Sequence, residues 1–277
     1  MSTRCITPFY KKNDLQNQHI PFPCGKCPNC MRRRTSGWSF RLVKEGERSN
    51  SALFVTLTYN TDHVPITKNG YMTLDKTDLQ KYFKRLRKLT HEKIRYYAVG
   101  EYGTKNQRPH YHIILFNAST RIVENAWKIN NVDIGTIYIG NVSDASIGYT
   151  LKYMTKQGKI PMHQNDDRQK EFSVMSKGIG ANYLTKQMIK WHKADTEKRM
   201  YIPIKDGKKI AMPRYYKDKM YTEGEKFIIS NYLKKVAEKE EEKLDKEFGE
   251  NKNAILAEQH LNQFRKMHKS AIQNRNL

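Results

Sequence analysis

Alternating apolar and polar residues indicate the strands of a sheet in the first half of the chain. Residues 53–59 are rich in β-branched and aromatic side chains at every second position, which predicts a strand. The same criteria predict strands over 95–101, 110–116 and 134–139. The short connection between the second and third of these strands favours antiparallel pairing.

Two segments have the spacing of helices instead. Thr77 and Gln80 fit a capping box at the start of a helix over 77–89, and a second helix is predicted over 144–157. The order strand, helix, three strands, helix is not a regular βαβ alternation. It predicts an α+β fold with a central antiparallel sheet and flanking helices, which we expect on one face of the sheet.

The pattern along the whole chain divides it into three parts. Residues 1–48 form a cysteine-rich arm with a basic helix, 49–195 hold the predicted sheet, and 196–277 form a basic connector and a charged helical extension. The sparse apolar positions of that extension are typical of a solvated or self-associating helix. No apolar run reaches the roughly 18 residues of a membrane span, and the N-terminus lacks the apolar core of a signal peptide. We therefore expect a soluble intracellular protein without a membrane partner.

Charge changes this picture, because it points to a polyanionic partner. The chain has 51 Lys and Arg against 28 Asp and Glu, a net charge of +23, and its 11% aromatic content argues against wholesale disorder. The excess is uneven: residues 222–277 have a net charge of +1, and residues 1–221 of +22. Nucleic acid is the expected partner, and the body of the chain is where it should bind.

The N-terminal part contains a pattern typical of metal sites. The chain has four cysteines, Cys5, Cys24, Cys27 and Cys30, and the last three form a Cys-x2-Cys-x2-Cys run. Tight spacing of this kind suits one tetrahedral metal, for which Cys5 would supply a fourth thiolate. A structural Zn²⁺ site is the prediction; an iron–sulfur cluster or free thiols are the alternatives. Three arginines follow, which either contact phosphates or form a solvated face: Arg32, Arg33 and Arg34.

A second candidate metal site lies on the third predicted strand. His110 and His112 are two residues apart, so their side chains project from the same face and can bind one divalent ion. Glu101 ends the preceding strand across a hairpin and is placed to supply an oxygen ligand, or alternatively to pair with Arg108. Histidine pairs of this spacing are also common as surface or core residues.

The second predicted helix places phenols and ammonium groups on one face. An arc of about 100° contains Tyr149, Lys152, Tyr153 and Lys156. The opposite side is apolar and would anchor the helix. Tyrosines beside lysines and a metal suit nucleophilic attack on phosphorus. A lysine-rich surface face with tyrosines covering the lysine stems is the alternative.

Taken in order, three motifs resemble a known family. They are Phe-x-Thr-Leu-Thr-Tyr at 54–59, His-x-His at 110–112, and Tyr-x-x-Lys-Tyr-x-x-Lys at 149–156. This order resembles the rolling-circle replication initiators of the HUH endonuclease superfamily. The doubled tyrosine and the cysteine run followed by arginines are similar to the gokushovirus branch of the Microviridae. The resemblance covers about residues 1–190.

The resemblance implies a function and a site. Residues 54–59 would be the central strand; His110, His112 and Glu101 would bind Mg²⁺ or Mn²⁺. Tyr149 and Tyr153 would be nucleophiles, with Lys152 and Lys156 as their partners. Such proteins nick single-stranded origin DNA, stay linked to the 5′ phosphate, free a 3′ hydroxyl for host enzymes and later rejoin the strand.

The expected setting is the cytoplasm of an infected bacterial cell, with a host helicase and polymerase as further partners. Arg32–Arg34 and Arg108 would contact DNA, and the basic helix at 77–89 would lie around the site together with Lys152 and Lys156. Two other readings stay open. One is a non-catalytic zinc-containing nucleic-acid-binding protein, and the other is a relaxase or transposase of the same superfamily.

Overall fold

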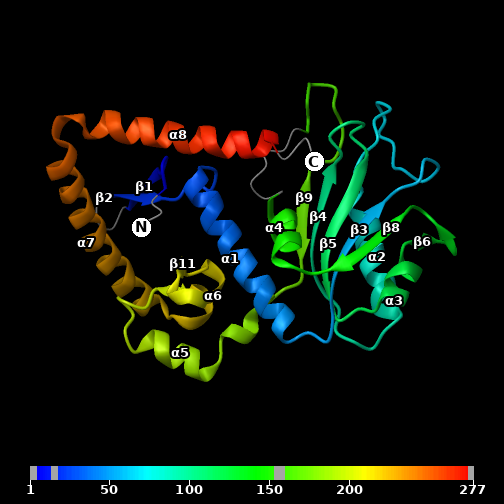
Figure 1. Cartoon of the computed structure of the whole chain (residues 1–277), viewed down its shortest axis with the longest axis horizontal. Coiled ribbons are helices and arrows are strands. Elements are labelled where there is room, and N and C mark those ends of the chain that lie inside the picture. The colour runs from blue at the N-terminus through cyan, green and yellow to red at the C-terminus, as the bar shows by residue number, and fades with distance from the viewer. Residues whose placement is uncertain (1–4, 14–17, 153–159, 274–277) are drawn as a thin grey trace. The chain divides into compact units, whose positions relative to one another are not determined.

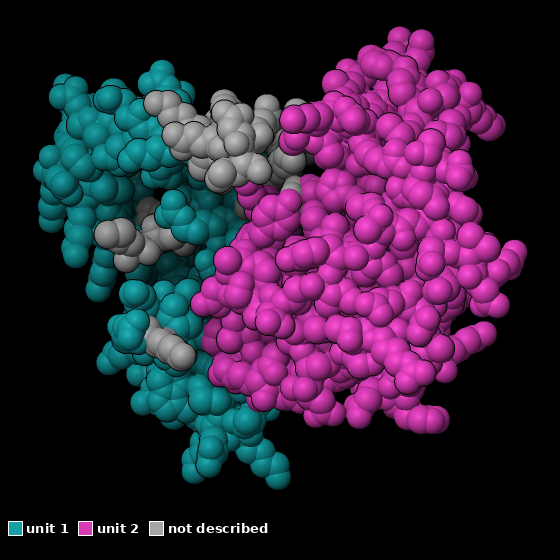
Figure 2. All heavy atoms as spheres, turned by 45° about the vertical axis from the view of Figure 1, so that its right-hand side comes forward, with its two compact units in different colours: residues 1–38, 183–277 teal, residues 39–182 magenta. Residues whose placement is uncertain are grey.

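The computed structural model describes residues 5–13, 18–152 and 160–273, and these fall into two compact units (Figure 2). One unit comprises residues 1–38 and 183–277, and the other residues 39–182. Helix α1, Pro28–Glu47, contributes residues to both units. Among the described residues, no helix is both long and apolar enough to cross a membrane.

Residues 39–182 are built on a five-stranded antiparallel sheet (Figure 1). Its strands, in spatial order, are β8 (Ile137–Asn141), β3 (Ala52–Thr58), β5 (Pro109–Phe116), β4 (Arg95–Tyr102) and β9 (Phe172–Met175). The α+β fold and the strands β3, β4 and β5 are therefore as predicted. The fourth predicted strand, 134–139, forms as β8 but begins three residues later, and β9 was not predicted. The centre of the sheet is β5, and the strand over 54–59 lies beside it, so the position taken from the resemblance is wrong by one strand.

The alternation along the inner strands builds a core on one face of the sheet. Val55 and Leu57 of β3 and Tyr111 of β5 bury their side chains there. Helix α2 (Lys76–Lys88) covers this face, and α3 (Thr120–Ala126) joins it. The buried residues of α2 are Leu79, Tyr82, Phe83 and Leu86. Each large apolar side chain of this kind contributes about 1.5–3 kcal/mol by leaving water.

Helices also cover the opposite face of the sheet, where α4 (Asp144–Lys152) packs against β5 (Figure 1). Tyr149 of α4 contacts His112, a residue of β5 next to Tyr111 and therefore on the other face. The prediction of helices on one face is wrong. The physical reason is that β5 is buried on both sides, as expected for the middle strand of a covered sheet.

The start of α2 differs from the predicted capping box. Asp75 is the N-cap, and its Oδ1 accepts hydrogen bonds from the Thr77 backbone N–H (2.6 Å) and the Thr77 hydroxyl (2.7 Å). Thr77 is therefore a donor within the first turn, and the helix begins one residue earlier, at Lys76. Aspartate and threonine are both good N-caps, so the sequence alone did not distinguish them.

The other unit contains a hairpin, short helices and the helical extension. Its elements are β1 (Phe9–Asn13), β2 (Gln18–Phe22), α5 (Lys186–Lys193), β10 (Tyr201–Pro203), β11 (Lys209–Ala211), α6 (Arg214–Met220), α7 (Glu223–Phe248) and α8 (Lys252–Gln273). The extension is helical as predicted, and it divides at Gly249, whose φ of 51° ends α7. Shorter elements of this unit are the 3₁₀ turns Lys205–Gly207 and Gly249–Asn251. Residues 39–182 also contain the short strands β6 (Lys128–Ile129) and β7 (Val132–Asp133), and the 3₁₀ turn Ala181–Tyr183 lies where the two units meet in the sequence.

Candidate metal centre and tyrosine helix

The pairing of β4 with β5 brings two imidazoles and a carboxylate together. Glu101 lies directly opposite His110, and His112 is two residues further along on the same face. The Nε2 atom of His110 is 2.8 Å from Glu101 Oε1, and the Nε2 atom of His112 is 3.1 Å from the same oxygen. All three ligand atoms lie within 4.8 Å of one another. The three residues that the sequence singled out thus form one cluster.

The ring of His110 is held in an orientation that suits a metal ligand. Its Nδ1 lies 3.1 Å from the Arg108 carbonyl oxygen, which can only accept, so Nδ1–H is the donor. In a neutral ring Nε2 then presents a lone pair to the Glu101 oxygen. Two acceptors at this distance require a proton or a cation between them. The donor set therefore fits a divalent ion, and backbone anchoring of the second ring nitrogen is usual for metal-binding histidines.

The protonation states of the cluster also suit a cation. Burial alone would raise the pKa of Glu101, but hydrogen bonds with His110 and His112 lower it below its ordinary value. Burial lowers the pKa of His112. The side chains accordingly favour a carboxylate and a neutral imidazole, which are the forms that bind divalent ions. Two imidazoles and one carboxylate leave coordination positions open for a substrate.

Two residues of β3 support the cluster and were missed as site residues. The Thr56 hydroxyl lies 2.9 Å from His112 Nδ1, and these two residues face each other across the strand pair. The Phe54 ring stacks on the His112 imidazole with a centroid distance of 5.7 Å and an interplanar angle of 9°. The sequence contained a signal for both: every second residue of neighbouring strands shares a face with the histidine pair.

Helix α4 places the first tyrosine against this cluster. Ile147, Thr150 and Leu151 are buried and fix the helix on the sheet. The Tyr149 ring meets the His112 ring edge-on, with a centroid distance of 5.1 Å and an angle of 85°. With 44% of its surface exposed, Tyr149 remains open to a substrate. Lys152 is half-buried at the end of α4.

The other half of the predicted tyrosine–lysine face, Tyr153 and Lys156, lies outside the described residues.

The residues predicted to contact DNA lie in different places. The Arg108 guanidinium donates to the Tyr59 carbonyl from Nε (3.2 Å) and Nη2 (2.9 Å). The residues Arg32–Arg34 are exposed on α1. The basic helix α2 packs on the face of the sheet opposite the cluster, so the expectation that it lies around the site is wrong. The four cysteines are brought together, and all their sulfur atoms lie within 4.8 Å of one another.

The covered antiparallel sheet brings a histidine–carboxylate cluster and a tyrosine together, and comparison with known proteins gives the family. Residues 52–158, from β3 past the end of α4, match the family model of replication-associated proteins of the ORF2 type. The chain is 30% identical to "Replication-associated protein ORF2" of Spiroplasma virus 4 over 249 residues, 82% of this chain and 76% of that protein. This chain belongs to the replication-associated proteins of Microviridae-type phages, which confirms the resemblance seen in the sequence.

Two further relatives have the same kind of description. "Replication-associated protein VP4" of Bdellovibrio phage phiMH2K is 23% identical over 229 residues, covering 75% of this chain and 70% of the relative. "Replication-associated protein ORF4" of Chlamydia phage 1 is 25% identical over 257 residues, covering 79% and 60%. No solved structure matches the chain.

Proposed function

We propose that this protein initiates phage DNA replication by nicking one strand of origin DNA through metal-dependent tyrosine attack, and later rejoins it. The observation that carries the proposal is the edge-on contact of the Tyr149 ring with His112, within a cluster whose three ligand atoms converge. A nucleophile next to an open metal site is the arrangement that phosphoryl transfer requires.

In this mechanism Glu101, His110 and His112 would hold the metal, because their ligand atoms lie within 4.8 Å of one another. When bound, Mg²⁺ or Mn²⁺ supplies positive charge to the scissile phosphate and orients it for in-line displacement. Arg108 and Thr56 keep the two imidazole rings in place through their contacts with the Nδ1 atoms. The proposed site is therefore built from side chains of β3, β4 and β5.

The chemical step is a transesterification. The phenolic oxygen of Tyr149 attacks phosphorus, the bond from phosphorus to the 3′ oxygen breaks, and the phenolic proton ends on that oxygen. The products are a 5′-phosphotyrosine ester and a free 3′ hydroxyl. A phenol is a weak nucleophile at neutral pH, and an ammonium group three residues along a helix, such as Lys152, can contact the phosphate and stabilise its negative charge during the attack.

Rejoining needs a second attack on the stored ester. In the proposed scheme Tyr153, four residues after Tyr149 in the sequence and with Lys156 as its partner, makes the second nick while the first end stays linked to Tyr149. The 3′ hydroxyl freed by the second nick then attacks the phosphorus of the Tyr149 ester, which forms a new phosphodiester and releases the phenol of Tyr149. Single-stranded origin DNA is the proposed substrate, and the +22 charge of residues 1–221 favours a polyanion. Host enzymes in the infected cell would unwind the duplex and extend the 3′ hydroxyl.

A covalent-adduct assay tests the nucleophile. A labelled single strand containing the origin is incubated with the full-length protein and Mn²⁺ and resolved on a denaturing gel. We expect a protein–DNA adduct that disappears in the Tyr149→Phe/Tyr153→Phe variant, and peptide mass spectrometry of the adduct should name the attacking tyrosine. Tyr138→Phe is the matched control, because Tyr138 lies on the same sheet and is 64% exposed. An adduct formed by the double variant contradicts the assignment.

A second comparison tests the metal ligands. His110→Ala removes a proposed metal ligand and should reduce cleavage at least about 100-fold, because losing even a residue that only supports a ligand costs about 10–100-fold; it should leave DNA affinity largely intact. His91→Ala is the control, since His91 is exposed and outside the cluster. Unchanged cleavage by His110→Ala would rule out the proposed metal centre. Metal-independent DNA binding without any cleavage by the wild type would identify a non-catalytic binding protein.

A further inference from the structure

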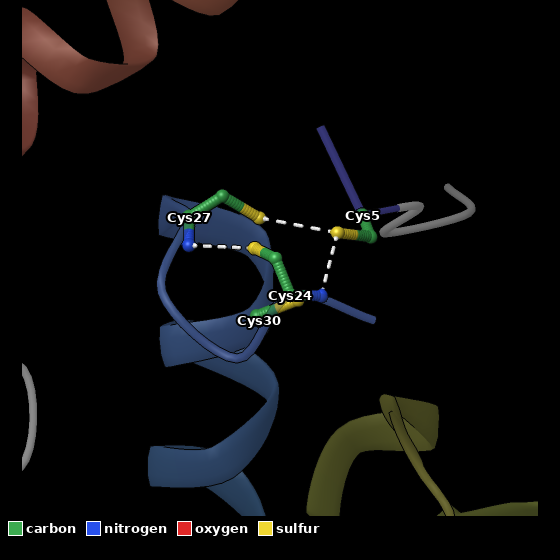
Figure 3. Close-up of side chains that lie close together, drawn as sticks. All are labelled: Cys5, Cys24, Cys27 and Cys30. Carbon is green, nitrogen blue, oxygen red and sulfur yellow. Dashed lines mark hydrogen bonds between the residues drawn. The ribbon is translucent and has the colours of Figure 1, made fainter. Parts of the chain in front are cut away.

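Four thiols meet where the β1–β2 hairpin joins α1 (Figure 3). Cys5 lies before β1, Cys24 after β2, Cys27 just before α1 and Cys30 in its first turn. The sulfur atoms of Cys5 and Cys27 are 3.9 Å apart, and all four lie within 4.8 Å of one another. The residues thus converge from both ends of the hairpin and from the helix.

The spacing of the sulfur atoms is that of a tetrahedral thiolate site. With zinc–sulfur bonds of about 2.3 Å, sulfur atoms at the corners of a tetrahedron lie about 3.8 Å apart. The four cysteines are free thiols rather than disulfides. One sulfur pair lies near this distance and all four sulfur atoms lie within 4.8 Å of one another, so small shifts would let them coordinate one ion.

Hydrogen bonds to the sulfur atoms add a second line of evidence. The donors are Lys26 N–H (3.3 Å), Cys27 N–H (3.2 Å) and the Thr7 hydroxyl (3.3 Å) to Cys24 Sγ, Cys24 N–H (3.2 Å) to Cys5 Sγ, and Ile6 N–H (3.4 Å) to Cys27 Sγ. Backbone N–H groups directed at sulfur stabilise negative charge there and fix the direction of each ligand. The loop around the cysteines is therefore arranged for thiolates.

The β1–β2 hairpin needs a further attachment to the rest of the chain to be stable. A two-stranded hairpin is marginally stable in water without a core. The side chains of Phe9 and Tyr10 in β1 are 48% and 61% exposed, and Phe22 at the end of β2 is 39% exposed. Phe9 and Phe22 stack on each other, with ring centroids 5.6 Å apart, and this exposed pair is a weak substitute for a core.

We propose that Cys5, Cys24, Cys27 and Cys30 bind one Zn²⁺ as four thiolates, and that the ion fastens the β1–β2 hairpin to the first turn of α1. Soft thiolates select Zn²⁺, whereas the carboxylate and imidazoles of the other cluster suit harder divalent ions. Four protein ligands leave no open coordination position, so this ion holds the chain together and takes no part in strand transfer. The inference does not depend on the proposed nicking activity.

Metal analysis of the full-length wild type tests the stoichiometry. We expect one zinc per chain, released when a mercurial reagent titrates four thiols. Replacement with Co²⁺ should give the visible absorption bands of tetrahedral cobalt thiolate. These bands should be absent in Cys24→Ser and Cys30→Ser, and retained in the matched Glu101→Ala/His110→Ala/His112→Ala variant, which removes the other cluster.

Several results would overturn the proposal. They are iron and inorganic sulfide in place of zinc, folded wild-type protein without bound metal, or cobalt thiolate bands in the cysteine variants. If a cysteine variant does not fold, the mercurial titration of the wild type still decides. Zinc removal should also make trypsin cleave after Lys11 and Lys26 roughly tenfold faster, as expected for a local loss of order. Unchanged cleavage there would contradict the fastening role.

Discussion

Tyr111 shows how one residue links the strand of the histidine pair to the helix that covers its other face. It lies between His110 and His112 but faces the opposite side of the sheet, where its ring is fully buried. Its hydroxyl accepts from the Asp75 N–H (2.9 Å) and lies 2.8 Å from the Asp75 carbonyl oxygen and 2.9 Å from the Tyr59 hydroxyl. Tyr111 lies at a core position of β5, and its hydroxyl has a specific partner there, the backbone of Asp75 at the N-cap of α2.

We expect Tyr111→Phe to lower the free energy of unfolding by about 1–3 kcal/mol, because it leaves the Asp75 backbone groups without their partner. Urea unfolding followed by fluorescence measures the change. Tyr138→Phe is the control and should change stability by less than about 0.5 kcal/mol, since Tyr138 is exposed. Equal stability of Tyr111→Phe and the wild type would show that these hydrogen bonds are not needed for folding.

The ion pair of Asp166 with Arg168 makes the stability of the protein depend on pH. Its buried carboxylate accepts from Arg168 Nε (2.8 Å), Arg168 Nη2 (2.8 Å) and the Met162 backbone N–H (2.7 Å). The hydrogen bonds from Arg168, joined by that from Met162, hold the pKa of Asp166 well below its ordinary value. A depressed pKa in the folded state means that the stabilisation is complete above the ordinary pKa and is lost as pH falls toward the folded-state pKa.

Asp166→Asn should therefore cost about 1–3 kcal/mol of stability at neutral pH. The difference from the wild type should shrink once the pH falls below about 4, near the pKa of an unperturbed aspartate. Urea unfolding at a series of pH values measures both effects. A difference that stays constant down to the acid limit would show that the carboxylate charge does not stabilise this loop.

At the scale of elements, the long strands were predictable and the short ones were not. β3, β4 and β5 are seven or eight residues long, are rich in β-branched and aromatic residues, and begin within one residue of their predicted starts. β9, with four residues, β10 and β11, with three each, and the hairpin near the N-terminus have no such pattern. Their formation depends on partners that are distant in sequence, which local spacing does not reveal.

The site was predictable from the same periodicities, and its surroundings were not. A period of two placed His110 and His112 on one face, and a hairpin placed Glu101 opposite them. The helical period placed Tyr149 opposite Ile147 and Leu151, which are buried. The face of the sheet that α2 covers was predicted wrongly because β5 is buried on both faces. Its sequence therefore does not say which helix covers the histidines.

Gly135 tests the connection into the edge strand β8. A Cβ atom at this position would lie 1.7 Å from the Thr58 carbonyl oxygen, at the end of β3. We expect Gly135→Ala to cost more than about 4 kcal/mol and to abolish cooperative melting, because backbone would have to move. Gly224→Ala in α7 meets open space. This control should keep or raise stability by up to about 1 kcal/mol; equal melting of both variants would contradict the close approach.

At the scale of the whole molecule, the charge excess belongs to the body rather than to the extension. Residues 222–277 balance their charges, and within the described part Lys252 pairs with Glu241 and Asp245. Residues 1–221 have a net charge of +22. Condensed counterions released by phosphate contacts make DNA affinity fall with salt, so the slope of affinity against salt concentration counts such contacts.

Two charge-matched variants distinguish body from extension. Each contact with single-stranded DNA contributes about 0.7 to the slope, so Arg32→Ala/Arg33→Ala/Arg34→Ala should lower it by about 2 if all three contact phosphate. Lys235→Ala/Lys239→Ala/Lys243→Ala removes three exposed charges from α7 and should leave the slope unchanged. Fluorescence anisotropy of a labelled single strand over a series of salt concentrations measures both. Equal losses would mean that the extension binds DNA as strongly as the arginines of α1, despite its balanced charge.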